Sequence, residues 1–236
     1  MKKINIIIVF LLIIIINSVI SLFYKIYEPF TSSTSTSTNG KNIVLIGDSI
    51  LKNNVFVPPK KSVEDFIKER NPENGLNNLA INGATIIDVH NQVKKISWDL
   101  DKEDTYIFLS AGGNDILENF VFSDNSAKVL DKLFNKYKYL VETLRATMDK
   151  SNIYLLDVYI PVDKKIQPYK DIINEWNNRV KDYASDTKNG INGVVDISVI
   201  MNDESDFTKD NMGYFVEPSK TGGEKIADKI IDTIPS

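Results

Sequence analysis

Cysteine is absent from the 236 residues of this sequence, and histidine occurs once, as His90. Without cysteine, the fold owes nothing to disulfides or thiolate metal sites, and the usual clue to the redox compartment is missing. A single histidine and the lack of a tight acidic loop motif leave no group of residues that predicts a metal site. No cofactor is predicted either, and His90 is expected to be a surface residue of a helix.

Long runs of basic residues are also absent. The chain has 28 Lys and Arg against 32 Asp and Glu, for a formal net charge of -4. The basic residues are scattered among the acidic ones, whereas a nucleic-acid surface needs them clustered on one face. No nucleic-acid partner is therefore predicted.

The N-terminus is strongly apolar. Residues 4–24 are almost all Ile, Leu, Val and Phe, and about 20 such residues span a bilayer as a helix. Residues 1–25 are therefore predicted to be a membrane anchor, with a cleaved signal peptide as the alternative. Lys2 and Lys3 precede the apolar run, so the positive-inside rule favours a single-pass protein with its domain on the extracytoplasmic side; after cleavage the domain would be secreted. Residues 26–40, rich in Ser and Thr, are predicted to be a flexible linker.

Residues 41–236 alternate between strand-like and helix-like segments. Strands are expected at 43–46, 77–81, 105–110, 152–158 and 193–197, and helices at 61–70, from 85 onward, 126–150, 171–184 and 224–234. The first strand has no polar alternation, which is typical of a strand buried on both faces. The alternation predicts one α/β domain in which a five-stranded parallel sheet lies between two layers of helices.

Glycine and polar residues follow the first three expected strands, as Gly47-Asp48-Ser49, Asn82-Gly83 and Gly112-Gly113-Asn114-Asp115. Taken singly, these blocks are ordinary caps and turns. In open α/β sheets, however, ligands bind beyond the carboxyl ends of the strands. Ser49 is also expected at the start of a helix, where free N–H groups favour negative charge. The sequence therefore predicts a crevice that brings together Ser49, the N–H of Gly83 and the side-chain amide of Asn114.

The order of these blocks resembles the SGNH (GDSL-like) hydrolase family of esterases and lipases, over residues 41–236. The resemblance implies a flavodoxin-like, three-layer α/β/α fold. It also implies that Ser49 is the nucleophile, and that the N–H groups of Ser49 and Gly83 and the side chain of Asn114 are oxyanion donors. The implied substrates and partners are ester-bearing small molecules, lipids or glycans.

The fourth block departs from the family pattern, Asp-x-x-His-Pro. Here it is Tyr214-Phe215-Val216-Glu217-Pro218, so Glu217 stands at the position of the base and Tyr214 at that of the aspartate. An exposed glutamate has a pKa about two units too low for a good base near neutral pH. Burial in the crevice would raise the pKa and make a Ser49–Glu217 dyad workable. The loop acids that could replace the third member are Asp203, Asp206 and Asp210.

Two functions stay open on the sequence. One is a membrane-tethered serine hydrolase of acyl or acetyl esters, with Ser49 as nucleophile and Glu217 as an atypical base. The other is a catalytically inactive binding module that keeps the oxyanion pocket and recognises an acylated or glycosylated partner. Segments 53–60 and 123–133 are expected at the entrance, where the candidates for apolar acyl contact are Phe56, Val57, Phe120 and Phe122. For Phe120 and Phe122, simple packing in the core is the alternative.

Overall fold

The computed structural model describes residues 40–121 and 127–235. The predicted anchor at residues 1–25 lies outside the described residues, as does the predicted linker up to residue 39. Within the described ranges, no helix combines the length and the apolar character needed to cross a bilayer.

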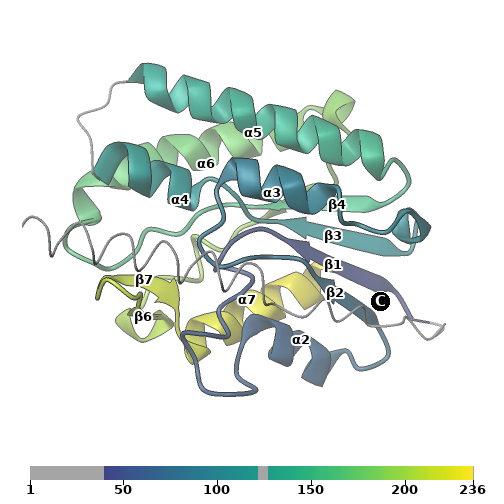
Figure 1. The fold of residues 1–236 in the computed structure, drawn as a ribbon, viewed down its shortest axis with the longest axis horizontal. Coiled ribbons are helices and arrows are strands. Elements are labelled where there is room, and N and C mark those ends of the chain that lie inside the picture. Colours follow the sequence, from purple (N-terminus) through teal and green to yellow (C-terminus); the bar gives the residue numbers. More distant parts are fainter. Residues whose placement is uncertain (1–39, 122–126, 236) are drawn as a thin grey trace, which may run out of the picture. The chain divides into compact units, whose positions relative to one another are not determined.

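A five-stranded parallel sheet forms the centre of the domain (Figure 1). Across the sheet, the strands lie in the order β2 (Gly75–Asn78), β1 (Asn42–Ile46), β3 (Thr105–Leu109), β4 (Asn152–Leu156) and β5 (Gly193–Val195). This is the strand order of flavodoxin-like, doubly wound sheets. The prediction of an α/β fold with five parallel strands is confirmed.

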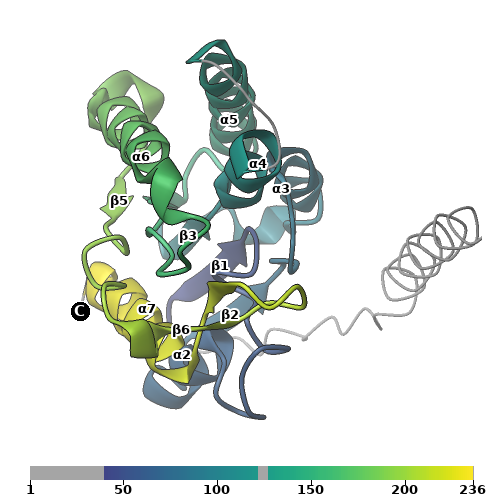
Figure 2. The same cartoon turned by 90° about the vertical axis from the view of Figure 1, so that its left-hand side faces the viewer.

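Helices cover both faces of the sheet (Figure 2). One face carries α3 (Ile86–Val93), α5 (Ala127–Thr147) and α6 (Lys170–Ser185), and the other carries α2 (Val63–Arg70) and α7 (Lys220–Thr233). Each face of the sheet has a hydrophobic core, and strand β1 contributes side chains to both. Val44 and Ile46 pack on the side of α3, α5 and α6, and Ile43 and Leu45 pack on the side of α2 and α7. Burial on both sides explains why the sequence of this strand shows no polar alternation.

Three local predictions were wrong. The second strand is Gly75–Asn78 rather than 77–81, because this edge strand is only half-buried and its sequence is not marked by an apolar pattern. Ser49 is followed by a single turn, closed by Leu51 N–H and Lys52 N–H on the carbonyl of Asp48, and no helix continues from it.

The third error concerns the closing helix, which begins at Lys220 rather than at 224. Glycine is unfavourable in a helix interior. The pair Gly222-Gly223 therefore argued against a helix here, and the first turn of α7 was not predicted. A Cβ at Gly222 would lie 2.2 Å from the carbonyl oxygen of Asp206. The close packing of α7 against this loop therefore requires glycine, and tertiary contact overrides local propensity.

Several short elements were not predicted. Strands β6 (Phe207–Lys209) and β7 (Phe215–Pro218) form an antiparallel hairpin outside the main sheet. Helix α4 (Gly113–Ile116) begins after the short loop that follows β3 and continues as a π-helical turn, η2 (Leu117–Val121). The short 3-10 turns are η1 (Trp98–Leu100), η3 (Gln167–Tyr169), η4 (Thr187–Asn189) and η5 (Glu204–Asp206). The β6–β7 hairpin matters most for the site because it carries Glu217.

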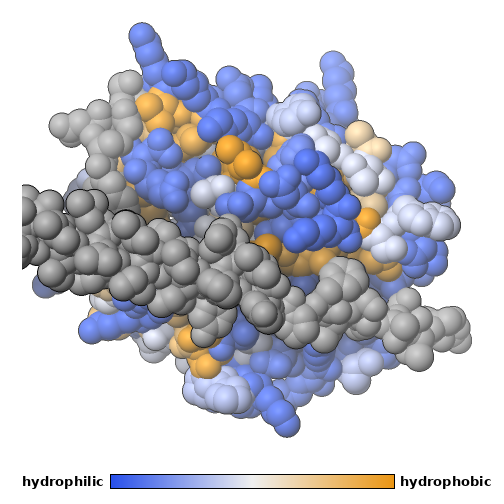
Figure 3. All heavy atoms as spheres, in the orientation of Figure 1, coloured by the Kyte–Doolittle hydropathy of each residue, from blue (hydrophilic) through white to orange (hydrophobic). Residues whose placement is uncertain are grey.

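Exposed apolar side chains are spread over the described surface. Those with large side chains include Val55, Ile87, Trp98, Tyr139, Val199 and Met212. On the face drawn in Figure 3, the hydrophobic areas are small and lie among hydrophilic side chains. Single exposed apolar residues of this kind are normal on protein surfaces.

Candidate active site

The turn after β1 is held by a buried side chain from α3. Gln92, which is fully buried, accepts a hydrogen bond from Gly47 N–H at 2.7 Å and donates one to the Gly47 carbonyl at 2.8 Å. Gly47 has a φ of +149°, and a Cβ there would lie 2.5 Å from the carbonyl oxygen of Ser110. Glycine is therefore required where the chain turns out of the sheet, and Gln92 fixes the residues that follow.

Asp48 lies beneath this turn as a buried carboxyl group. Its Oδ1 accepts hydrogen bonds from Ser110 Oγ at 2.8 Å and from Ile50 N–H at 3.1 Å. Burial raises the pKa of Asp48 to about 6, although these two hydrogen bonds favour its charged form. Asp48 therefore anchors the turn rather than capping a helix, and it places a second acid next to Ser49.

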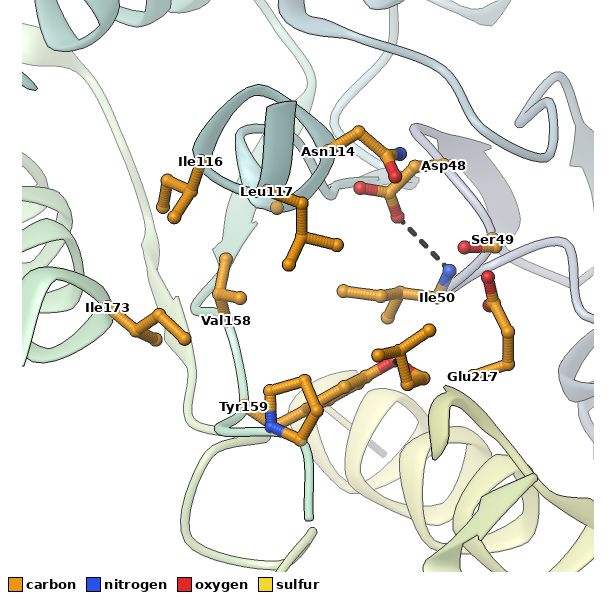
Figure 4. A pocket seen from close by; sticks show the side chains of 13 residues that line it. Asp48, Ser49, Ile50, Asn114, Ile116, Leu117, Val158, Tyr159, Ile173 and Glu217 are labelled. Atoms are coloured by element: carbon orange, nitrogen blue, oxygen red, sulfur yellow. Dashed lines mark hydrogen bonds between the residues drawn. The ribbon is translucent and has the colours of Figure 1, made fainter. Parts of the chain in front are cut away.

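Ser49 and Glu217 lie together at one pocket, although their elements are far apart in the sequence (Figure 4). Their exposed fractions are 7% and 8%. Burial raises the pKa of Glu217 to about 7; the adjacent hydroxyl of Ser49 lowers it, and the charges of Asp48 and Asp210 raise it. One carboxyl oxygen of Glu217, Oε2, is buried without a hydrogen-bond partner among the described residues. An acid of this kind can accept a proton near neutral pH.

Two buried side chains hold the backbone of β7 on either side of Glu217. Tyr159 donates its hydroxyl proton to the carbonyl of Val216 at 2.8 Å, and Asn53 Nδ2 donates to the carbonyl of Pro218 at 3.2 Å. Asn53 Oδ1 also accepts the N–H of Val63 at the start of α2. The position of Glu217 therefore depends on contacts from the loop after β4 and the loop after β1.

Asn114 connects the loops that follow β2 and β3. Its Nδ2 donates to the carbonyl of Ala84 at 2.9 Å, and the residue lines the pocket. An amide nitrogen carries two N–H groups, so this bond orients the side chain and leaves the second N–H for a ligand. Asp115 reinforces the connection because its Oδ2 accepts the N–H of Ile86 at 2.9 Å. Gly83 has a φ of +73° but is not among the residues that line the pocket, so the role of its N–H stays a prediction.

Among the described residues, none of the candidate third members forms a hydrogen bond with the Glu217 carboxyl group. Asp203 caps η5 at the surface, and Asp206 is buried against Lys225. Asp210 accepts the N–H groups of Met212 and Tyr214 within the β6–β7 turn. The Tyr214 ring lies under Lys165 Nζ at 4.6 Å, and its hydroxyl accepts a hydrogen bond from the same Lys165. The pocket therefore presents a Ser–Glu pair with Asp48 beside it.

Other candidates lie away from the pocket. His90 stacks on Tyr139 with 5.4 Å between the ring centroids and does not line the pocket. Of the residues expected to contact an acyl chain, Phe122 is outside the described residues, and the three described ones do not line the pocket. Phe56 and Val57 lie elsewhere, and Phe120 is in the core. In residues 40–121 and 127–235, no cluster of His, Asp and Glu side chains could hold a metal ion.

Several residues that build the site were missed from the sequence. Gln92, Ser110, Asn53 and Tyr159 all act on groups that are remote in the chain. A polar residue on the apolar face of a helix is the one local signal that could have revealed Gln92, because buried polar side chains are normally hydrogen-bonded. Nothing local marks the other three.

The two buried acids make stability depend on pH. Both fold with a pKa above the ordinary value, 3.8 for Asp48 and 4.5 for Glu217. Such groups stabilise the folded state when they are protonated, and this contribution is lost as pH rises through the folded pKa. We expect the free energy of unfolding to fall between about pH 4.5 and 7, by up to about 3 kcal/mol for Glu217.

Denaturant titrations of the wild type and Glu217→Gln from about pH 5 to 8 measure this change. Glu217→Gln lacks one of the two titrating groups, so its stability should depend less on pH and exceed that of the wild type at pH 8. Equal slopes in the two proteins would mean that Glu217 folds with an ordinary pKa.

Comparisons with known proteins agree with this architecture. The model of the GDSL-like lipase/acylhydrolase family matches residues 45–224. None of the curated proteins compared matches the sequence. A solved structure of a lipolytic protein of the G-D-S-L family from Veillonella parvula has a TM-score of 0.59 and 19% identity, and the match covers 81% of this chain and 97% of that one.

Two further solved structures are similar to this domain. A GDSL-like lipase from Bacteroides thetaiotaomicron has a TM-score of 0.62 and 21% identity over 89% of this chain and 95% of that one. An acetyl xylan esterase has a TM-score of 0.64 and 16% identity over 82% of this chain and all of the other. At these identities the structural likeness shows the fold. Since the family model extends from β1 into α7, the chain belongs to the GDSL-like lipase/acylhydrolase family.

Proposed function

We propose that this protein is a serine hydrolase of acyl esters in which Ser49 is the nucleophile and Glu217 its general base. The observation that carries the proposal is the hydroxyl of Ser49 beside a buried carboxyl group whose pKa is about 7. A general base works best when its pKa lies near the working pH. Burial thus gives this glutamate the basicity that histidine has in water.

The reaction follows from the positions of these groups. Ionised Glu217 takes the proton of Ser49 Oγ while Oγ bonds to the carbonyl carbon of the ester. The negative charge moves to the carbonyl oxygen, where the N–H groups of Ser49 and Gly83 and the amide of Asn114 stabilise it. The bond to the alcohol then breaks, and the alcohol leaves with the proton from Glu217. In the second half, Glu217 takes a proton from water, whose oxygen attacks the acyl carbon, and Ser49 recovers a proton as the acid departs.

Charge balance favours this order of events. Glu217 becomes neutral when it accepts the proton, so the oxyanion forms beside a carboxylic acid rather than beside a second anion. Asp48 has the lower pKa of the two acids and therefore ionises first as pH rises. The charge of Asp48 raises the pKa of Glu217. The hydrogen bonds from Ser110 and Ile50 stabilise the charged form of Asp48 itself.

Asn114→Ala is expected to lower kcat for ester hydrolysis about 10²- to 10³-fold, because it removes a donor to the oxyanion. KM should change little, since the ground-state ester carries less negative charge on its oxygen than the transition state. Steady-state kinetics measure both constants. Asn91→Ala, on the exposed side of α3, is the matched control and should leave both unchanged. An equal loss in the two variants would contradict the assignment of Asn114.

The proposed activity is tested by labelling with a fluorophosphonate probe and by hydrolysis of p-nitrophenyl esters. We expect labelling and turnover to rise together between about pH 5 and 8 as Glu217 ionises. A protein that folds but neither reacts with the probe nor hydrolyses any ester across this range would overturn the proposal.

A second candidate is a non-catalytic binding module for an acylated or glycosylated partner. The observation that favours it is that Glu217 and Tyr214 stand where the family pattern has the catalytic histidine and aspartate. A module of this kind would bind an ester without cleaving it. Failure of labelling, together with saturable binding of an intact ester, would support this candidate over the hydrolase.

The proposal extends to location. The apolar sequence at residues 4–24 and the preceding Lys2 and Lys3 support a tether to a membrane with the hydrolase domain on the extracytoplasmic side, or secretion of the domain if the segment is a cleaved signal. Cell fractionation is expected to recover the full chain with membranes and a chain lacking residues 1–25 away from them. Recovery of a shortened mature protein in the medium would indicate cleavage instead. Recovery of the full chain free of membranes would contradict both.

A further inference from the structure

The pocket beside Ser49 has two unlike sides (Figure 4). Asp48, Ser49, Asn114 and Glu217 lie on one side. The opposite side, called here the apolar wall, consists of Ile116, Leu117, Val158 and Ile173. The empty space between the two sides, including the part open to solvent, is about 480 Å³.

The apolar wall is part of the folded core. Ile116 and Ile173 are 1% and 2% exposed and pack in the cluster between the sheet and helices α5 and α6. Leu117 is partly buried and points into the space between Ser49 and Val158 (Figure 4). Since core side chains are closely packed and held in place, the wall is a preformed surface.

The apolar wall extends away from the reacting groups. In Figure 4, Ile173 lies on the far side of the pocket from Ser49 and Glu217. An acetyl group has a single methyl carbon beyond its carbonyl, so it would leave the part of the pocket next to Ile173 unfilled. The four side chains of the apolar wall have no charged or hydrogen-bonding group with which to bind a sugar there.

We propose that the apolar wall binds a linear acyl chain longer than acetyl, so that the substrates are esters of aliphatic acids rather than acetylated carbohydrates. This inference rests on the proposed hydrolase function and specifies its substrate class. Leu117 and Ile173 limit the length of chain that fits. Burial of each methylene should raise kcat/KM about fourfold until the pocket is full.

The first test compares p-nitrophenyl acetate, butyrate, hexanoate and octanoate as substrates of the full chain. We expect kcat/KM to rise about fourfold per added methylene from acetate before it levels off or falls. A kcat/KM that is highest for acetate would overturn the acyl-chain proposal while leaving the hydrolase intact.

Binding of neutral amides tests the pocket without turnover. N-methylhexanamide should raise the Tm of the wild type more than N-methylacetamide does at the same concentration. If no ester is hydrolysed but this preference is found, the hydrolase proposal fails and the acyl-chain site stands. If the two amides act equally, the acyl-chain site fails.

Variants of the wall test its position. Leu117→Phe narrows the pocket and should reduce the ratio of hexanoate to acetate kcat/KM about tenfold. Leu100→Phe is the matched control, because Leu100 is another partly buried leucine that packs on the same core cluster but does not line the pocket. Ile173→Ala should shift the preference toward longer chains. If Ile173→Ala does not fold, comparison of Leu117→Phe with Leu100→Phe still tests whether the acyl chain lies against the wall. An unchanged ratio in Leu117→Phe would place the acyl chain elsewhere.

Discussion

Ser49→Ala is expected to abolish fluorophosphonate labelling and to lower kcat for ester hydrolysis at least about 10³-fold, since it removes the hydroxyl on which the proposed acyl-enzyme forms. The neighbouring hydroxyl, on Ser110, cannot substitute, because it is buried and already donates to Asp48. The structure itself should persist, since the substitution removes one oxygen and leaves the Gln92 bonds to Gly47 unchanged. Gel-based labelling and steady-state kinetics measure the loss.

Ser151→Ala is the matched control for this prediction. Ser151 is also buried, but its hydroxyl bonds to Leu100 and Asp101, residues that do not line the pocket. The control should label and turn over like the wild type. Ester hydrolysis that survives in purified Ser49→Ala would mean that another residue, or another protein in the sample, carries the activity.

Glu217→Gln is expected to lower kcat/KM about 10²- to 10⁴-fold, the usual contribution of a positioned general base. The amide nearly matches the carboxylate in shape but cannot accept the serine proton. For the wild type, the pKa of about 7 sets the pH profile. Since the base acts in its ionised form, kcat/KM should rise about tenfold per pH unit below pH 7 and level off above it. Initial rates across this range measure the profile.

Glu224→Gln provides the control, because Glu224 lies on α7 as a surface partner of Arg70. This variant should keep the wild-type rate and profile. If Glu217→Gln retains full turnover, or if the wild-type profile is already level at pH 5, Glu217 is not the base. If Glu217→Gln is inactive yet more stable than the wild type at pH 8, the buried Glu217 carboxylate lowers the stability of the wild type while serving catalysis. This is the trade-off expected for an acid buried for catalysis.

Much of the fold could be predicted from local patterns. An unbroken apolar run predicts strand β1, and long amphipathic stripes predict α5 and α6. The bounds of the edge strand β2 were not predicted, because a half-buried Gly-Leu-Asn-Asn segment has little apolar character. The β6–β7 hairpin was missed for a related reason, since its strands are short and pair with each other rather than with the main sheet.

Part of the site was predictable for a geometric reason. The carboxyl ends of parallel strands meet at one edge of a sheet, so Ser49 and Asn114 were expected in one pocket, and both line it. Glu217 joins them from the hairpin outside the sheet, where only the family resemblance pointed to it. Phe56 and Val57 do not line this pocket, and Phe120 packs in the core, which was the alternative for that residue. Apolar character alone does not tell a pocket wall from core or surface.

The sequence by itself determined the alternation of the five sheet strands with the longer helices, because apolar runs and turn residues act over short distances. It also determined the blocks at the strand ends and the identity of the acid at position 217. Only the tertiary structure decided how that acid behaves. Its pKa depends on burial and on Asp48, and its position depends on a hydrogen bond that spans 165 residues, from Asn53 to Pro218. Likewise, Gln92 reaches Gly47 across 45 residues. Such contacts exist only after the chain has packed, since desolvation and long-range hydrogen bonds are properties of the assembled core rather than of any one segment.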